Sequence, residues 1–185
     1  MHTDQEDWFM ELQKEVKRDP LEIAVGMEIE GKEFYLKAGE KSGDQFGQKL
    51  FARLAREEDF HAVKALEIAN ALKSGQTPAT IENLFDAGKR INSIFAWAQK
   101  DIEPRKQIAQ DEFDAIRLAL DLEERTRTFY KEQSTKAETE FERSFFKALM
   151  NEERGHYLSL VDYREYLTDP ASWFVKAEHH SLDGA

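Results

Sequence analysis

The chain has 185 residues, 41% of them hydrophobic, which is enough for one buried core, so a single domain over residues 1–185 is expected. No apolar run approaches the roughly 20 residues of a membrane span, and the N-terminus lacks a basic region followed by an apolar one, so a cytoplasmic protein is expected. The formal charge of −11 disfavours nucleic acid and anionic membranes as partners, and the absence of cysteine excludes disulfides, thiolate metal sites and catalytic thiols.

Helix-forming residues dominate the composition, with only four Pro and nine Gly, which favours an all-α fold. A short amphipathic helix is expected first, from its apolar residues Trp8, Phe9 and Leu12. Asp19 before Pro20 predicts a helix start, because Asp caps helices and Pro fits the first turn. A turn at residues 42–44 and a helix end near Gly75 then give a first hairpin over about 19–75.

The following segment, residues 76–110, is expected to be a crossover made of a helix and a loop. A second hairpin follows over about 111–168, with its turn between Ser134 and Glu140, and a tail covers 169–185. A crossover this long can run the length of a bundle, so the second hairpin would repeat the first about an approximate two-fold axis. The predicted fold is an all-α four-helix bundle built from two duplicated helical hairpins.

One pattern of residues occurs twice, 95 residues apart (Glu28 and Glu123). In each copy a Glu is followed after seven positions by a Tyr and after 30 positions by a Glu-x-x-His pair. A single Glu-x-x-His is weak evidence in a chain rich in Glu, but a repeat in register indicates a duplicated hairpin. The two copies are Glu28, Tyr35, Glu58, His61 and Glu123, Tyr130, Glu153, His156.

This repeat predicts a dinuclear metal site. Residues three apart lie on nearly the same helical face, so both members of a Glu-x-x-His pair can face one ion. The lone Glu of each copy joins them from the neighbouring helix. In carboxylate-bridged sites of this kind two Glu bridge the ions, and each ion has one further Glu and one His. The predicted ligands are Glu28, Glu58, His61, Glu123, Glu153 and His156.

The charge of these residues also favours bound cations. Four carboxylates balance two divalent ions, whereas without ions each would cost several kcal/mol in a buried core or take up a proton. Oxygen and imidazole donors without thiolates suit iron or manganese, and zinc would bind too. The predicted cofactor is a pair of iron ions, with manganese or zinc as alternatives.

Four residues near the predicted ligands have two readings each. Tyr35 and Tyr130 follow the lone Glu residues by two turns and so face the same interior. Each either donates its hydroxyl to a ligand carboxylate or fills the bundle as a large side chain. Glu57 and Glu152 lie about 100° around their helices from the neighbouring ligands, either at the surface or in support of a ligand.

The tail holds further donors, namely Glu178, His179, His180 and Asp183. Adjacent imidazoles and carboxylates suit a metal ion, but residues near a chain end have no fixed geometry, so a tail without a specific site is favoured. Trp173 and Phe174 predict that the start of the tail docks on a folded surface.

The first hairpin has the pattern Ala24, Glu28, Phe34, Tyr35, Leu54, Ala55, Glu57, Glu58 and His61. Apart from Ala55, it is repeated in the second hairpin as Ala119, Glu123, Phe129, Tyr130, Leu149, Glu152, Glu153 and His156. This pattern resembles the rubrerythrin branch of the ferritin-like superfamily and covers both hairpins. The resemblance implies a ferritin-like di-iron bundle that uses the six ligands and reduces hydrogen peroxide or reacts with dioxygen.

The chain departs from that family in two ways. Rubrerythrins carry a cysteine-containing rubredoxin module that delivers electrons, and this chain has no cysteine. They also place an extra carboxylate beside the site, whereas the residues one turn from the lone Glu residues are Val25, Gly31, Leu120 and Thr126. Both departures bear on the reaction rather than on metal binding.

The leading hypothesis is a di-iron oxidoreductase that consumes peroxide or dioxygen and takes electrons from a separate protein. The first alternative is an iron-binding protein with a ferroxidase, storage or delivery role, and the second is a structural metal-bound bundle without redox work. Hydrophobic residues in the N-terminal helix and the tail predict a homodimer. Exchange of hairpins between the subunits stays open, because the two halves of the motif are equivalent.

Overall fold

The computed structural model describes residues 19–76 and 110–173, which form four long helices and contain no strand. The predicted all-α fold is thereby confirmed for this part of the chain. Within the same residues, no helix combines the length and the apolar character needed to cross a membrane. The predicted N-terminal helix, residues 77–109 of the predicted crossover and the tail after residue 173 lie outside the described residues.

The first hairpin consists of α2 (Pro20–Lys41) and α3 (Gln45–Lys73). Helix α2 begins where the sequence predicts, because the Asp19 carboxylate accepts a hydrogen bond from the Leu21 amide at 2.9 Å and Pro20 occupies the first turn. Asp44 caps α3 in the same manner. The two caps therefore fix where each helix of this hairpin begins.

The second hairpin consists of α5 (Gln110–Lys136) and α6 (Glu140–Thr168). Its turn falls between Ser134 and Glu140, as predicted. Thr139 and Glu142 form a capping box, in which each side chain accepts a hydrogen bond from the backbone amide of the other residue. The reciprocal bonds set the point at which the chain turns back.

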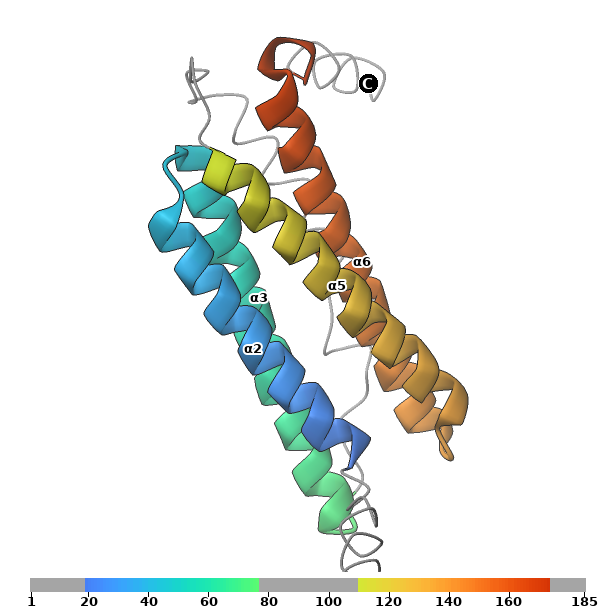
Figure 1. Cartoon of the computed structure of the whole chain (residues 1–185). Helices are drawn as coiled ribbons and strands as arrows, with labels where there is room; N and C mark the ends of the chain where they lie inside the picture. The colour runs from blue at the N-terminus through green and yellow to red at the C-terminus, as the bar shows by residue number, and fades with distance from the viewer. Residues whose placement is uncertain (1–18, 77–109, 174–185) are drawn as a thin grey trace, which may run out of the picture.

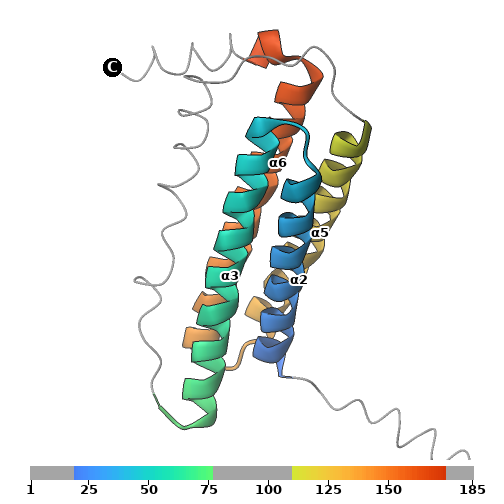
Figure 2. The ribbon, with the colours of Figure 1, turned by 90° about the vertical axis from the view of Figure 1, so that its left-hand side faces the viewer.

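The two hairpins lie side by side in a four-helix bundle (Figures 1 and 2). Helices α2 and α3 run antiparallel, as do α5 and α6, whereas α3 and α5 run in the same direction. The end of α3 and the start of α5 therefore lie at opposite ends of the bundle. A connection between them has to return along its length, which is what the predicted crossover requires.

Buried residues alternate in character along the bundle. On α3, the stretch from Phe46 to Ala55 belongs to one apolar cluster and that from Ala65 to Ala69 to another. The buried Glu58 and His61 lie between them. The predicted ligands thus occupy a polar layer with apolar packing on both sides, which keeps water away from it.

A second set of buried polar groups joins the hairpins at the end of the bundle that holds the α2–α3 turn. The Glu112 carboxylate of α5 accepts hydrogen bonds from the Ser42 hydroxyl at 2.7 Å and from the Tyr163 hydroxyl at 2.8 Å. Trp173 packs at this end too, with its ring centroid 5.5 Å from that of Tyr166. The predicted docking of the start of the tail is confirmed for Trp173, while Phe174 lies outside the described residues.

Candidate metal centre

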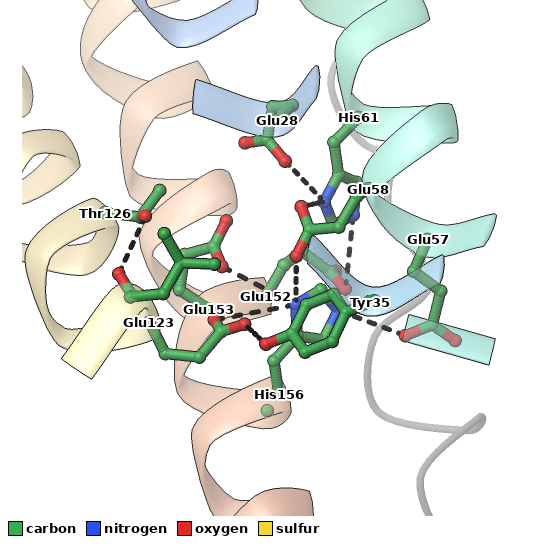
Figure 3. A network of polar contacts seen from close by, with 12 residues as sticks. Glu28, Tyr35, Glu57, Glu58, His61, Glu123, Thr126, Glu152, Glu153 and His156 are labelled. Carbon is green, nitrogen blue, oxygen red and sulfur yellow. Dashed lines mark hydrogen bonds and ion pairs between the residues drawn. The ribbon is translucent and has the colours of Figure 1, made fainter. Parts of the chain in front are cut away.

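All six predicted ligands converge inside the bundle (Figure 3). Each of the four helices contributes: α2 and α5 supply the lone Glu residues, and α3 and α6 supply the Glu-x-x-His pairs. The six side chains belong to residues that are at most 3% exposed. Ionisable groups are almost never this buried unless they are paired or bind a metal, so their convergence marks a specific site.

The donor atoms fall into two overlapping groups. Within each group one ligand atom from every residue lies within 4.8 Å of the others. Glu58 and Glu153 belong to both groups. The remaining members are Glu28 and His61 in one group and Glu123 and His156 in the other. Two shared carboxylates between two further Glu and His pairs are the arrangement that a carboxylate-bridged ion pair requires.

Both histidines present the same ring nitrogen to the carboxylates. Nδ1 of His156 lies 3.1 Å from Oε1 of Glu58 and 3.5 Å from Oε2 of Glu153. Nδ1 of His61 lies 3.4 Å from Oε2 of Glu28. The two imidazole rings stack at a centroid distance of 5.6 Å. Nδ1 is therefore the nitrogen available to a metal, and Nε2 is directed to the outside of the centre.

Burial and mutual repulsion keep the shared carboxylates protonated when no cation is present. Burial and the charge of Glu28 raise the pKa of Glu58 to about 8. Burial and the charges of the neighbouring carboxylates raise the pKa of Glu153 well above its usual value. Burial also acts upward on the pKa of Glu28, but contacts with Glu58 and His61 outweigh it and hold that pKa at about 2. The four carboxyl groups thus cannot all ionise without a compensating charge.

For the histidines, burial and the neighbouring carboxylates shift the pKa in opposite directions. Burial lowers the pKa of His61, yet the carboxylates of Glu28 and Glu58 raise it to about 9 overall. The pKa of His156 is likewise raised well above its usual value, because the surrounding carboxylates outweigh burial. In the absence of a metal, protons on these rings and on the shared carboxylates supply the positive charge that the centre demands.

Several buried donor atoms have no hydrogen-bond partner among the described residues: Oε2 of Glu28, Oε2 of Glu123, Oε1 of Glu153 and Nδ1 of His156. A buried polar atom left without a partner costs about 1–3 kcal/mol. Coordination to a cation satisfies all of them. Carboxylate oxygens with imidazole nitrogens are a donor set that suits iron or manganese. The residues present therefore fit a metal ion in each donor group.

Each tyrosine of the repeat supports a carboxylate of the other hairpin. The Tyr35 hydroxyl donates to Glu123, and the Tyr130 hydroxyl donates to Glu28. Burial and the neighbouring carboxylates raise the pKa of both hydroxyls, so each keeps its proton. Both rings are also fully buried in the core. Each tyrosine therefore both donates its hydroxyl to a ligand carboxylate and fills the core with its ring.

Glu57 and Glu152, expected at the surface or in support of a ligand, lie beside the histidines of the opposite hairpin. Glu57 Oε2 is 3.1 Å from Nε2 of His156, and Glu152 Oε2 is 3.8 Å from Nε2 of His61. The sequence did not predict that these contacts cross between hairpins, nor that Arg53 donates to Glu57 at 2.7 Å. The signals that point to them are the second Glu in both motifs and the i,i+4 spacing.

Gly31 and Thr126 lie one turn after the lone Glu residues, where an additional carboxylate would lie beside the site. A Cβ atom on Gly31 would lie 3.2 Å from Cδ of Glu58, so this glycine makes room for a shared carboxylate. The buried Thr126 donates its hydroxyl to the Leu122 carbonyl at 2.9 Å. The tail donors at residues 178–183 lie outside the described residues.

Comparison with known families agrees with this geometry. The family model described as Rubrerythrin matches residues 19–163, from the cap of α2 into α6. The match includes both hairpins and all six predicted ligands. Neither the curated proteins nor the solved structures compared with the chain gave a match.

Proposed function

The chain belongs to the rubrerythrin family, and on that basis we propose that it is a di-iron carboxylate oxidoreductase that reacts with peroxide or dioxygen. The observation that carries this proposal is the sharing of Glu58 and Glu153 between two donor groups. Shared carboxylates hold two ions at a short distance, so that both can act on one small molecule.

In this proposal the protein provides the ligands and controls their protons. Glu28 and His61 would hold one ion, Glu123 and His156 the other, and the two shared carboxylates both. When bound, iron supplies the electrons that reduce the oxidant. The hydroxyl groups of the two tyrosines fix the orientation of the lone carboxylates. The apolar clusters on both sides exclude water from the centre.

In this proposal, the electrons for repeated reduction of the oxidant come from another molecule. Reduction of hydrogen peroxide to water consumes two electrons and two protons, and the 185 residues contain no cysteine that could hold a second redox centre. A separate electron-donor protein is therefore part of the proposal. The alternative, an iron-binding protein that oxidises ferrous iron once and stores or delivers it, has the same ligands but no need for a donor.

Peroxide consumption separates these alternatives. The metal-free full chain is loaded anaerobically with ferrous iron, freed of excess metal, and mixed with hydrogen peroxide and a photoreduced flavin as electron donor. We expect peroxide to be consumed over many cycles per chain. His156→Ala is the control variant and is expected to lose about one iron per chain and the repeated turnover with it.

The other outcomes contradict the proposal in different ways. One stoichiometric oxidation that does not repeat, although reduced flavin remains, favours iron handling. The absence of any spectral change on addition of peroxide to the iron-loaded chain favours a structural site. Unchanged iron content in His156→Ala contradicts the ligand assignment itself.

A further inference from the structure

The outer nitrogens of the two histidines differ in their surroundings. Nε2 of His156 lies 3.1 Å from Oε2 of Glu57, which is hydrogen-bond distance. The matched pair in the other half of the centre, Nε2 of His61 and Oε2 of Glu152, is 3.8 Å apart. The duplication thus kept both outer carboxylates but set them at different distances.

A second difference lies one turn earlier on each helix. Arg53 Nε donates to Oε1 of Glu57 at 2.7 Å, and the side chains of Arg53 and Glu57 are only 13% and 15% exposed. The residue 95 positions after Arg53 is Ala148, so α6 itself has no arginine at the position that matches Arg53. Arg53 engages one carboxylate oxygen of Glu57 and leaves the other to the histidine.

This chain of contacts has a direct consequence for the metal ligand. A carboxylate that accepts the Nε2 hydrogen of an imidazole keeps the lone pair on Nδ1, which is the nitrogen that faces the ligand carboxylates. It also fixes the plane of the ring and makes Nδ1 more basic. Loss of such a partner typically weakens metal binding by about 10- to 100-fold. The arginine limits the rotamers of the glutamate, which reduces the entropy lost when the contact forms.

We propose that Glu57, held by Arg53, is the positioning residue of His156, and that it makes the donor group of His156 the tighter of the two metal sites. The inference rests on the proposed dinuclear centre and deepens it, because it gives the two ions different affinities and an order of loading. The half that contains Glu123 and His156 fills first. The half that contains Glu28 and His61 fills second.

Cobalt(II) is a suitable probe, because its visible absorption reports coordination without a redox reaction. The metal-free full chain is titrated anaerobically with cobalt(II) and followed by calorimetry and visible absorption. The wild type is expected to bind in two steps that differ by about tenfold or more. Glu57→Gln is expected to weaken the tighter step by about 10- to 100-fold.

The matched control is Glu152→Gln, the same change at the equivalent position of the other hairpin. It is expected to leave the tighter step within about threefold of wild type and to weaken the other step. Arg53→Gln provides an independent variant, since it keeps Glu57 in place and removes only its arginine. It is expected to weaken the tighter step in the same direction as Glu57→Gln, with the helix content unchanged by circular dichroism.

Three results overturn the inference. The first is a tighter step that neither Glu57→Gln nor Arg53→Gln weakens, and the second is a tighter step that Glu152→Gln weakens as much as Glu57→Gln does. The third is two steps of equal affinity in the wild type, which leaves the proposed function intact. Absence of saturable cobalt binding removes this inference and the proposed function together, so the two failures are distinguishable.

Discussion

Side chains of each hairpin support the ligands of the other. Tyr35 donates to Glu123, Tyr130 donates to Glu28, and Glu57 contacts His156. A hairpin on its own would therefore hold its ligands without the partners that orient them. At the scale of single residues, the centre depends on contacts between segments that are far apart in the chain.

Replacement of Tyr130 by Phe tests one of these contacts. The Phe ring keeps the packing against Phe146, whose ring centroid lies 6.2 Å away, while Glu28 loses a hydrogen bond in a buried site. We expect the free energy of unfolding of the metal-free chain to fall by about 1–3 kcal/mol. Urea unfolding followed by circular dichroism measures this change.

Tyr157→Phe is the control, because Tyr157 is only half-buried and belongs to neither donor group. Its effect should stay within about 0.5 kcal/mol. Equal effects of the two variants would show that the Tyr130 hydroxyl contributes nothing specific to Glu28.

At the scale of helices, the two hairpins pack closely against each other beside the α2–α3 turn. The amide of Gly47 donates to the Asp44 carboxylate at 2.9 Å, and the Tyr163 hydroxyl reaches the same carboxylate at 3.2 Å. A Cβ atom on Gly47 would overlap the Tyr163 hydroxyl oxygen and would lie 2.7 Å from Oε1 of Glu112. This glycine therefore permits the first turn of α3 to approach α5 and α6.

Gly47→Ala is expected to destabilise the protein by about 1–3 kcal/mol, because the added methyl group forces the buried polar groups apart. Gly26→Ala is the matched control on α2, where nothing lies within 4 Å of the added Cβ. That change should stabilise the helix by up to about 1 kcal/mol, since alanine is the better helix former. Thermal unfolding of both variants gives the comparison, and a stabilised Gly47→Ala would contradict the role of this glycine.

The helices themselves were predictable because their signals are local. Asp19 before Pro20 marks a helix start, and the 3.6-residue periodicity with a repeat in register gives four helices and six inward-facing ligands. The cross-hairpin contacts were not predictable in the same way. Glu57 lies about 100° from Glu58 on an isolated helix, and only the position of α6 brings His156 within its reach. A pattern on one helix contains no information about the distance to another.

At the scale of the whole molecule, the balance of protons in the centre makes stability depend on pH when metal is absent. The folded state raises the pKa of Glu58 to about 8 and that of His61 to about 9, and it raises the pKa values of Glu153 and His156 as well. The folded chain therefore binds more protons than the unfolded chain between about pH 4.5 and pH 9. Stability from these groups is full below that range and is lost as the pH rises through it.

We thus expect the metal-free protein to lose unfolding free energy from about pH 5 to pH 8, by about 1.4 kcal/mol per pH unit for each extra proton held. Urea unfolding in the presence of a chelator measures the slope. The metal-loaded protein should not show this loss, because its ligands are already deprotonated. A metal-free protein that becomes more stable over this range would contradict the charge balance described for the centre.

The cytoplasmic location and the homodimer stay predictions. The same holds for the N-terminal helix, the crossover helix and the tail, which lie outside the described residues. Light scattering of the full chain at several concentrations tests the dimer directly. A mass of one chain at all concentrations would contradict it. The outcome has no bearing on the ligand assignment, because the same six residues would form the centre whether or not the hairpins are exchanged between subunits.

The most direct test of the central claim is an anaerobic titration of the metal-free chain with ferrous iron, followed by calorimetry and elemental analysis. The wild type should saturate at two irons per chain. A double variant, Glu58→Gln with Glu153→Gln, should show no saturable binding, because both donor groups lose their shared carboxylates. Saturation of the wild type at one iron or none, or retention of both irons by the double variant, would contradict the claim that these carboxylates hold an iron pair.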